Sequence, residues 1–385
     1  MTASPPVPRP PLTAIPADIT CLADYERHAA GHLPEASRHH VDSGTGEGLT
    51  LHDNRAAFGR IRLAPRALAD LRQGSTRTLL LGQWHESPIL LAPVAFHRLA
   101  HSGGECETAR AAAALQVGMA VSTLSSQPLE DIAAASRAAS AELHRAPAPL
   151  WFQLYFQRDR EHSLALVRRA QAAGYQAVVV TVDASVKRSG FPLPQGVEAV
   201  NVRGYRSFEQ RSGGLGGPIL IGTPLIEGAP TWDDIAWLRA NCPLPLIVKG
   251  VVSPRDALRA IELGADALVV SNHGGRVLDG LPAAIDVLPR VAAAVAGRVP
   301  LLLDGGVRTG TDIVKSLALG ASAVMIGRPQ VHALAVAGLL GVAHALHLLR
   351  GELELAMAQL GCASIGEIDA GILWPAHPGT EAGRN

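Results

Sequence analysis

The segment at residues 271–276, Ser-Asn-His-Gly-Gly-Arg, places a possible base three residues before a possible anion-binding cation. It directly follows the apolar run Ala267–Val270, which is typical of a buried parallel strand. The strand would present the imidazole of His273 at its mouth, with the guanidinium of Arg276 close by. A base beside a carboxylate-binding cation is what proton removal from a hydroxy acid requires. A single histidine at a strand end is as often structural, so this hypothesis depends on the residues around it.

Two further segments combine glycine with arginine and predict a phosphate site. Asp304–Gly310 reads Asp-Gly-Gly-Val-Arg-Thr-Gly and Ile326–Pro329 reads Ile-Gly-Arg-Pro, and each belongs to the end of an apolar run. Glycine lets backbone N–H groups approach an anion, a helix N-terminus adds its dipole, and Arg308 and Arg328 offer bidentate contacts. The pattern indicates a bound phosphate but does not identify the molecule that carries it.

Lys249 also ends an apolar run, and a buried lysine is costly without a partner. A cation beside the N1–C2=O edge of an isoalloxazine ring would stabilise the anionic reduced flavin. Gln153 and Thr181, in two other apolar runs, could hydrogen-bond the pyrimidine edge of the same ring. A Schiff-base lysine is the rival interpretation, and the pairing of His273 with Arg276 makes it the weaker one.

These residues belong to a series of eight short apolar runs, which we predict to be strands. The runs are Pro88–Pro93, Met119–Ser122, Leu150–Tyr155, Ala177–Asp183, Leu244–Lys249, Ala267–Ser271, Pro300–Asp304 and Ala323–Gly327. Eight strands that alternate with helices indicate a (β/α)8 TIM barrel, an α/β fold in which the carboxyl ends of the strands converge on one face and build the active site. A doubly wound parallel sheet is the alternative fold.

Helical patterns separate most of these runs. One helix is predicted to begin after Ser253 as its N-cap and to end at Gly264 as its C-cap. Another is predicted to open at Thr309 or Thr311 and to close at Gly320. Such helices would cover the outside of the barrel.

The chain is predicted to form a single (β/α)8 barrel domain over residues 19–375, with a helical segment before the first strand. Residues 1–18 contain six prolines and read as a flexible arm, and residues 376–385 read as a flexible tail. The interval 184–231 is too long for one crossover and contains Gly-Gly-Leu-Gly-Gly, so we predict an enlarged, mobile lid after the fourth strand. A phosphate-binding P-loop is disfavoured there because its Lys-Ser/Thr pair is missing.

Composition argues against several classes of protein. Lys+Arg and Asp+Glu both total 34, and this zero net charge gives no electrostatic reason to bind nucleic acid or an anionic membrane. No apolar run is expected to reach the roughly 18–20 residues of a transmembrane helix. The four cysteines form no C-x-x-C pair, which argues against a zinc site or a disulfide framework and fits a reducing, cytoplasmic location.

Taken together, these residues resemble the FMN-dependent α-hydroxy acid oxidase and dehydrogenase family, which includes glycolate oxidase, lactate oxidase and mandelate dehydrogenase. The similarity covers residues 22–360 and is carried by Asp53–Phe58, Ala92–Ala95, Trp151–Tyr155, Thr181–Asp183, Val248–Val251, Ser271–Arg276, Asp304–Gly310 and Gly327–Pro329. Residues 92–99 and 123–126 are closer to the hydroxymandelate-oxidase-like branch than to plant glycolate oxidases.

The resemblance implies a role for each candidate site residue. His273 would be the active-site base, and Asp183 would support its imidazolium. Tyr155 and Arg276 would contact the substrate, and Arg276 would bind the substrate carboxylate. Lys249 would bind FMN and tune its chemistry. The other FMN-binding residues would be Val94, Ala95, Ser122, Gln153, Thr181, Ser271, Asp304, Gly305, Gly306, Arg308, Gly327 and Arg328.

Two positions in the substrate half of the site depart from the family pattern. The family has an N-terminal tyrosine that hydrogen-bonds the substrate carboxylate, and an ungapped comparison puts His40 there. The family also has a second carboxylate-binding arginine after the fourth strand, where this chain has Gly190, and only a short slip brings Arg188 into that place. His39 and His40 could suggest a metal, but no further ligand stands at a suitable spacing, so we predict no metal site.

The resulting expectation is an FMN-dependent oxidoreductase that oxidises a 2-hydroxy acid, or a related substrate with an altered anchoring group, to the keto product. Reduced FMN would pass its electrons to dioxygen or another acceptor. A catalytically degenerate FMN-binding protein that acts as a partner or sensor is the alternative, and the retained base argues against it. The resemblance also implies a homo-oligomer, because the family often forms tetramers.

Overall fold

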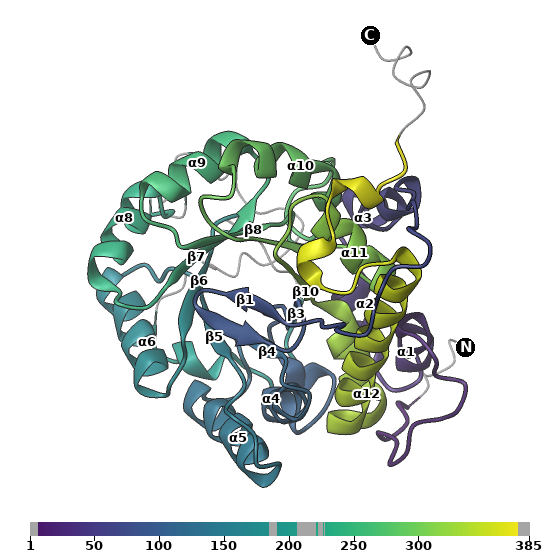
Figure 1. Cartoon of the computed structure of the whole chain (residues 1–385). Helices are drawn as coiled ribbons and strands as arrows, with labels where there is room; N and C mark the ends of the chain where they lie inside the picture. The colour runs from purple at the N-terminus through teal and green to yellow at the C-terminus, as the bar shows by residue number, and fades with distance from the viewer. Residues whose placement is uncertain (1–6, 185–190, 206–220, 222–225, 227, 376–385) are drawn as a thin grey trace.

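The fold is a closed barrel of eight parallel strands, which the computed structural model shows end-on in Figure 1. The structure describes residues 7–184, 191–205, 221, 226 and 228–375. The barrel strands are β3 (Ile89–Leu91), β4 (Gly118–Ser122), β5 (Leu150–Leu154), β6 (Ala177–Thr181), β7 (Leu246–Val251), β8 (Ala267–Val270), β9 (Leu301–Asp304) and β10 (Ala323–Ile326). They follow one another in chain order, and β10 pairs with β3 to close the ring. The predicted (β/α)8 barrel is therefore confirmed.

Helices cover the outside of the barrel (Figure 1). They are α4 (Gly104–Ala114), α5 (Leu129–Glu142), α6 (Arg160–Ala172), α8 (Trp232–Asn241), α9 (Pro254–Glu262), α10 (Ala284–Val295), α11 (Gly310–Ala318) and α12 (Arg328–Leu360), with the short 3-10 helices η1 (His97–Leu99), η2 (Val200–Val202), η3 (Ile365–Glu367) and η4 (Ala370–Ile372). The predicted N-caps are confirmed, since the side chains of Ser253 and Thr309 accept a backbone hydrogen bond in the first turns of α9 and α11. Gly264 and Gly320 follow the helix ends with φ angles of 88° and 105°, which glycine adopts without steric cost.

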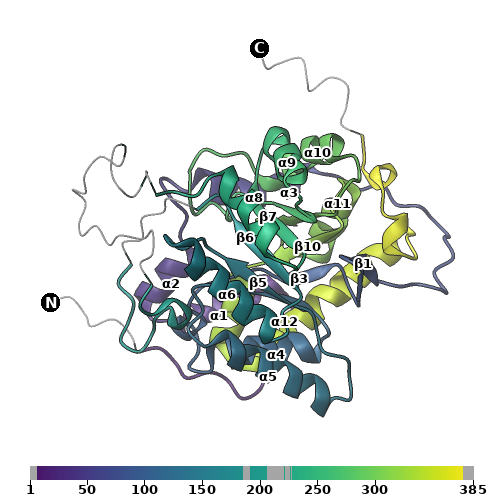
Figure 2. The ribbon, with the colours of Figure 1, turned by 90° about the vertical axis from the view of Figure 1, so that its left-hand side faces the viewer.

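Apolar side chains pack in two layers, one inside the barrel and one between the strands and the helices. Leu90 and Met325, both at most 1% exposed, belong to the inner layer. A hairpin of β1 (Thr78–Leu80) and β2 (Gln83–His85) closes one end of the barrel, with Leu80 buried against this layer. Figure 2 shows the hairpin at the end opposite α2. The sequence did not predict it, because three-residue strands are too short to show an alternating pattern.

His85, the last residue of β2, makes the stability of this end of the barrel sensitive to pH. It is 2% exposed, and burial lowers its pKa from 6.5 to about 4. Between these two values the unfolded chain binds a proton that the folded protein does not, so stability should fall as the pH drops, by up to about 3 kcal/mol. Urea unfolding at several pH values measures this, and His85→Phe should flatten the dependence. Equal pH profiles for the two proteins would contradict it.

Three helices precede the barrel and confirm the predicted N-terminal helical segment. They are α1 (Leu22–Ala29), α2 (Glu35–Asp42) and α3 (Leu49–Arg60). Residues 7–18, which we predicted to be part of a flexible arm, are instead docked on the protein. The backbone N–H groups of Arg9 and Leu12 donate to the carbonyl oxygens of Gly31 and Val336, at 2.9 Å and 2.7 Å. Prolines lack an N–H, but the residues between them find acceptors on the folded domain.

The helix α12 is long and apolar enough, by length and composition, to cross a membrane, which corrects the expectation that no segment reaches that length. However, 67% of its most apolar 18-residue window is buried inside the protein. Its backbone is also interrupted at Ala337 and Gly338, whose φ and ψ angles are not helical. These features are those of a core helix, and α12 packs against α1, α4 and α11. The predicted tail and most of the predicted lid lie outside the described residues.

Candidate active site

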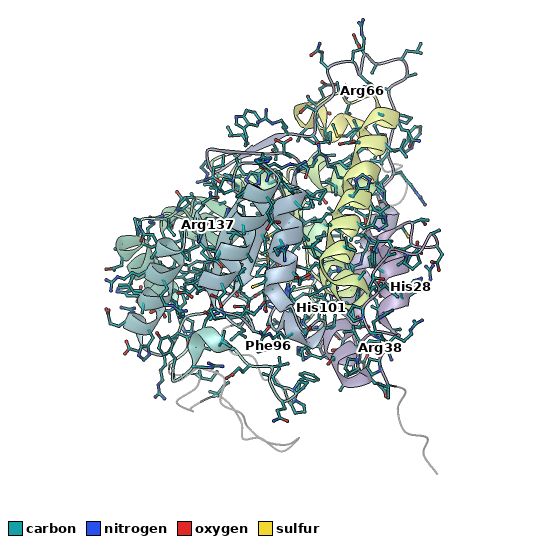
Figure 3. All side chains as sticks on the ribbon, turned by 90° about the horizontal axis from the view of Figure 1, so that it is seen from below. His28, Arg38, Arg66, Phe96, His101 and Arg137 are labelled. Carbon is teal, nitrogen blue, oxygen red and sulfur yellow. The ribbon has the colours of Figure 1, made fainter. Side chains whose placement is uncertain are left out.

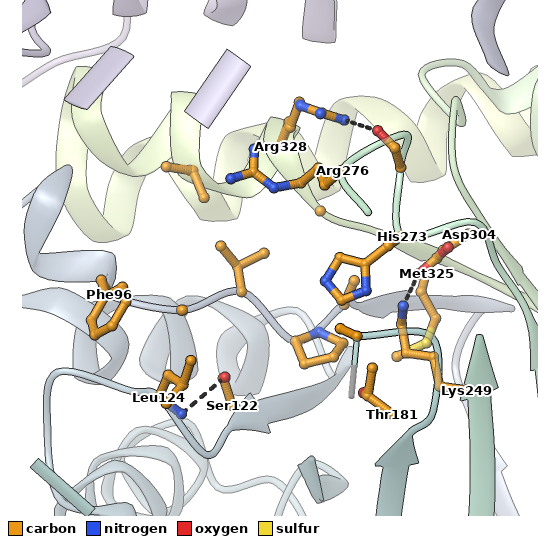
Figure 4. A pocket seen from close by; sticks show the side chains of 18 of the residues that line it. Phe96, Ser122, Leu124, Thr181, Lys249, His273, Arg276, Asp304, Met325 and Arg328 are labelled. Atoms are coloured by element: carbon orange, nitrogen blue, oxygen red, sulfur yellow. Dashed lines mark hydrogen bonds and ion pairs between the residues drawn. The ribbon is translucent and has the colours of Figure 1, made fainter. Parts of the chain in front are cut away.

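The polar strand ends meet in one cavity at the carboxyl end of the barrel (Figure 4). The predicted site residues that line it are His40, Val94, Ala95, Ser122, Tyr155, Thr181, Lys249, His273, Arg276, Asp304, Gly305, Gly306, Arg308, Gly327 and Arg328. Three further predicted residues do not line the cavity but hydrogen-bond to residues that do: Asp183, Gln153 and Ser271. Arg188 lies outside the described residues. The structure thus gathers every predicted site residue that it describes.

His273 has a carboxylate on one side of its ring and the hydroxyl of a cavity-lining tyrosine on the other. Its Nδ1 lies 2.8 Å from Oδ1 of Asp183, and its Nε2 lies 3.5 Å from the hydroxyl oxygen of Tyr155. Burial acts to raise the pKa of Asp183, but the charges of His273 and Lys249 outweigh it, so this pKa is lowered. An ionised carboxylate at Nδ1 fixes the tautomer and stabilises a protonated ring. The imidazole is therefore set to accept a proton at Nε2.

The turn that carries His273 has an unusual backbone. His273, Gly274 and Gly275 have successive φ angles of 57°, 62° and 73°, which glycine adopts freely and histidine only with strain. The buried side chain of Asn272 pairs with that of Asn54 on α3 through two reciprocal hydrogen bonds of 2.9 Å. This pair helps to hold the strained turn in place. The sequence analysis gave neither amide a role.

Lys249, on β7, is 4% exposed and has two partners. Its Nζ lies 2.8 Å from Oδ2 of Asp304 and donates to Oγ of Ser271 at 3.0 Å. Burial acts to lower its pKa, but the negative charges of Asp304 and Asp183 outweigh it and raise the pKa. The amine is therefore protonated. This disfavours the Schiff-base alternative, because imine formation needs a neutral amine.

Three partly buried arginines, Arg276, Arg308 and Arg328, border the cavity. Arg276 donates from Nη1 to three backbone carbonyl groups in residues 40–43, and Arg328 donates to the same segment. Burial lowers the pKa of all three, and the charges of Arg276 and Arg308 lower that of Arg328 further, to about 10. A guanidinium group whose pKa is lowered by neighbouring cations is stabilised when an anion binds among them.

The backbone of the loop after β9 packs closely against α3, and only glycine fits there. Gly305 and Gly306 have φ angles of 96° and 91°, and a Cβ on Gly306 would lie 2.1 Å from the carbonyl oxygen of Asn54. Arg55 fixes the loop by donating to Gly306 O at 2.5 Å and to Asp312 at 2.7 Å. The loop then enters the N-terminus of α11, whose dipole favours a phosphate.

Some polar atoms at the cavity are buried without a hydrogen-bond partner among the described residues. They include Nε2 of Gln153, Oγ1 of Thr181 and Oδ1 of Asp304. Such atoms are rare unless a ligand or water satisfies them. The amide N–H of Gln153, the hydroxyl of Thr181 and the Lys249 ammonium suit the pyrimidine edge of a flavin, and the arginines and glycines suit its phosphate. The residues present therefore fit FMN.

His40, near the end of α2, lies in the same cavity as Arg276 and Tyr155. Its ring stacks on Phe191, with the centroids 4.3 Å apart and the planes at 21°. Its carbonyl oxygen accepts a hydrogen bond of 2.8 Å from Arg276. Within the described ranges, no group of three or more His, Cys, Asp or Glu side chains is placed to hold a metal ion.

Comparisons with known proteins agree with this geometry. A family model described as FMN-dependent dehydrogenase matches residues 29–375. An L-lactate oxidase from Nostoc sp. is 45% identical over 370 residues, which cover 94% of this chain and 100% of that protein. The human 2-hydroxyacid oxidase 1 is 40% identical over 361 residues, which cover 91% and 95%. A solved structure of mandelate oxidase with benzoyl-formic acid matches with a TM-score of 0.81 and 39% identity, covering 92% and 98%. The chain belongs to the FMN-dependent dehydrogenase family and is an FMN-dependent oxidoreductase.

Proposed function

We propose that the protein oxidises a 2-hydroxy acid to the 2-keto acid and uses dioxygen as the electron acceptor. The observation that carries this proposal is the setting of His273, with Asp183 at Nδ1 and with Arg276 in the cavity that the imidazole lines. Relatives named L-lactate oxidase and 2-hydroxyacid oxidase support the substrate class and the acceptor. Bound FMN would take up the two electrons and the second of the two hydrogens that leave the substrate, the first leaving as a proton to His273.

The residues of this chain would orient the substrate and move its proton. Arg276 has five N–H donors, and those not directed to residues 40–43 among the described contacts can bind a carboxylate. The hydroxyl of Tyr155 would hydrogen-bond the substrate oxygen. His273 would accept one proton at Nε2 as the C–OH group becomes C=O, and Asp183 would stabilise the imidazolium. Lys249 would hold a positive charge beside the ring edge of the cofactor.

Aerobic incubation of the FMN-loaded protein with a panel of 2-hydroxy acids tests this proposal. We expect equal amounts of hydrogen peroxide and of the matching 2-keto acid. Keto acid without peroxide would contradict dioxygen as the acceptor. If FMN-loaded protein formed neither product from any acid, the proposed activity would be wrong, and the catalytically degenerate flavin-binding protein would be favoured.

The cofactor prediction has its own measurement. The protein should be yellow and should release FMN, not FAD, on denaturation, because Gly305, Gly306, Arg308 and Arg328 form a single terminal phosphate site. Chromatography of the released flavin distinguishes the two. FAD in the supernatant, or a colourless protein that FMN does not reconstitute, would contradict the prediction.

His40 should affect how the substrate is anchored. An imidazole ordinarily changes its charge between about pH 5 and 8, and a charged His40 would add to the anion binding by Arg276. The KM should therefore rise with pH in the wild type, and His40→Phe should remove this rise. His40→Tyr should improve the use of small 2-hydroxy acids. If neither variant changed the KM or its pH profile, His40 would lie outside the substrate site.

A homo-oligomeric state and a cytoplasmic location also belong to the proposal, together with the expectation that neither nucleic acid nor membrane is a partner. The family's frequent tetramers and the balanced charge support these points. Light scattering of the purified protein and fractionation of the source cells test them. A monomer, or a protein found in the membrane fraction, would contradict them.

A further inference from the structure

Glu105 is a buried carboxylate that the proposed chemistry does not use. It lies in the first turn of α4 and is 1% exposed, the lowest value of any carboxylate that the structure describes. Its Oε1 accepts backbone hydrogen bonds from His97 and Ser126, at 3.0 Å and 2.8 Å, and its Oε2 accepts one from the hydroxyl of Ser126 at 2.7 Å. Burying a carboxylate is costly, and these bonds with the helix dipole offset the cost. Through these hydrogen bonds, Glu105 connects α4 to two loop segments that lie outside the helix.

The two segments are the loops after β3 and β4, which contain His97 and Ser126. They also meet directly, because the backbone N–H of Phe96 donates to Leu124 O at 3.2 Å. Phe96 has a φ angle of 56°, a left-handed conformation that is strained for a bulky side chain. Glu105 accepts the backbone hydrogen bond of His97, the residue that follows Phe96. It therefore holds Phe96 in a conformation that the residue would not adopt by itself.

A second buried side chain extends this arrangement to the loop after β6. Asn201 in η2 is 4% exposed, and its Nδ2 donates to Ser125 Oγ at 2.8 Å and to Gln127 O at 3.1 Å. The backbone N–H of Val200 donates to Ser125 O at 3.3 Å. The position of η2, and with it of Val202, thus depends on the β4 loop that Glu105 anchors.

These loops supply an apolar wall of the cavity, formed by Phe96, Leu99, Leu124, Phe156 and Val202. Figure 4 shows Phe96 and Leu124 together on the side of the cavity away from Lys249 and His273. Figure 3 shows Phe96 at the opposite end of the molecule from Arg66. A 2-hydroxy acid with its carboxylate at Arg276 and its reacting carbon at His273 has only its side chain left to meet this wall.

We propose that Glu105 is a positioning residue for the apolar wall and so adapts the site to 2-hydroxy acids with a large apolar side chain. This inference rests on the proposed oxidation of 2-hydroxy acids. Each methylene that the substrate buries against the wall adds favourable binding free energy. One methylene in a hydrophobic pocket changes kcat/KM by about tenfold or more. Displacement of the wall would remove this binding free energy but would leave the reacting atoms in place.

The first arm of the test compares substrates on the wild-type holoenzyme. The kcat/KM for 2-hydroxyoctanoate should exceed that for glycolate by at least about tenfold, because the longer chain reaches the wall. The second arm repeats the comparison with Glu105→Leu, which should lower this ratio by about tenfold, chiefly through a higher KM for 2-hydroxyoctanoate. Glu105→Gln keeps a carbonyl acceptor for the two backbone N–H groups and should retain most of the preference.

Two further variants separate positioning from a general loss of structure. Glu107→Leu changes a carboxylate on the same helix that contacts Leu339 and Arg110 instead of the loops, and it should leave the ratio unchanged. Ser126→Ala removes the Oε2 contact and the hydrogen bond that Ser126 Oγ accepts from the backbone N–H of Arg98, but it keeps both backbone bonds to Oε1. It should lower the ratio in the same direction, even if Glu105→Leu fails to fold.

The possible failures are distinguishable. A wild-type enzyme that prefers glycolate, or an unchanged ratio in FMN-loaded Glu105→Leu and Ser126→Ala, would overturn the inference while the proposed function stands. An equal fall of the ratio in Glu107→Leu would also overturn it, because the effect would then not depend on the loop contacts. Failure of every 2-hydroxy acid with the wild type would instead contradict the proposed function itself.

Discussion

Replacing His273 with glutamine is expected to lower the rate of flavin reduction by the substrate about 10²–10⁴-fold, the usual contribution of a positioned base. Glutamine is similar in size and polar, but it cannot accept a proton near neutral pH. FMN should stay bound, because the phosphate contacts expected from Arg308, Arg328 and the neighbouring glycines do not require the imidazole ring. Rapid mixing without oxygen measures the rate directly, and the visible spectrum of the flavin reports its occupancy.

A matched control lies on the surface of the protein. His28 on α1 also pairs with an aspartate, with its Nε2 3.0 Å from Oδ2 of Asp18. It lies at the edge of the molecule in Figure 3 and is not among the residues that line the cavity. His28→Gln should therefore reduce its flavin at the wild-type rate. If His273→Gln also kept that rate with the preferred substrate, His273 would be structural, and the central assignment would be wrong.

Replacing Lys249 with methionine is expected to destabilise the protein by about 3–5 kcal/mol, the usual effect of breaking a buried ion pair from one side. Methionine fills a similar volume but leaves the carboxylate of Asp304, whose Oδ2 lies 2.8 Å from Nζ, buried without its cation. The negative charge of Asp183 also interacts with the Lys249 ammonium, and the substitution would remove this favourable interaction. Urea unfolding of the FMN-free protein measures the change independently of any activity.

The double variant Lys249→Met with Asp304→Asn separates charge from packing. Because the amide carries no charge, the double variant should recover much of the lost stability although it has one more substitution. Equal stability of the wild type and Lys249→Met would contradict the role of the pair in the fold. A double variant no more stable than Lys249→Met would assign the loss to packing around the lysine stem.

The barrel strands were predictable because each is buried on both faces and reads as a continuous apolar run between turn residues. The β1–β2 hairpin was not, because its strands are three residues long and its burial depends on the barrel that it closes. The docking of residues 7–18 was also missed. Proline-rich composition describes the freedom of an isolated chain and carries no information about the acceptors, such as Val336 O, that the folded protein supplies.

The reactive residues could be predicted because the fold places them, since the ends of parallel strands in a barrel converge on one face. His273, Lys249 and Asp304 are of this kind. Asn54 and Glu105 were missed because their roles exist only in the tertiary contacts. Asn54 meets Asn272 across 218 positions of the sequence, and Glu105 bridges two loops from a helix that reads as an ordinary alanine-rich helix. No local pattern marks such a residue.

Single-turnover mixing of the FMN-loaded protein with 2-hydroxy acids in the absence of oxygen tests the central claim most directly. The account predicts that at least one acid bleaches the oxidised flavin completely and yields one 2-keto acid per flavin, and that His273→Gln slows this step about 10²–10⁴-fold. The contradicting result is a flavin that stays oxidised with every acid, although a chemical reductant such as dithionite reduces it in the same protein.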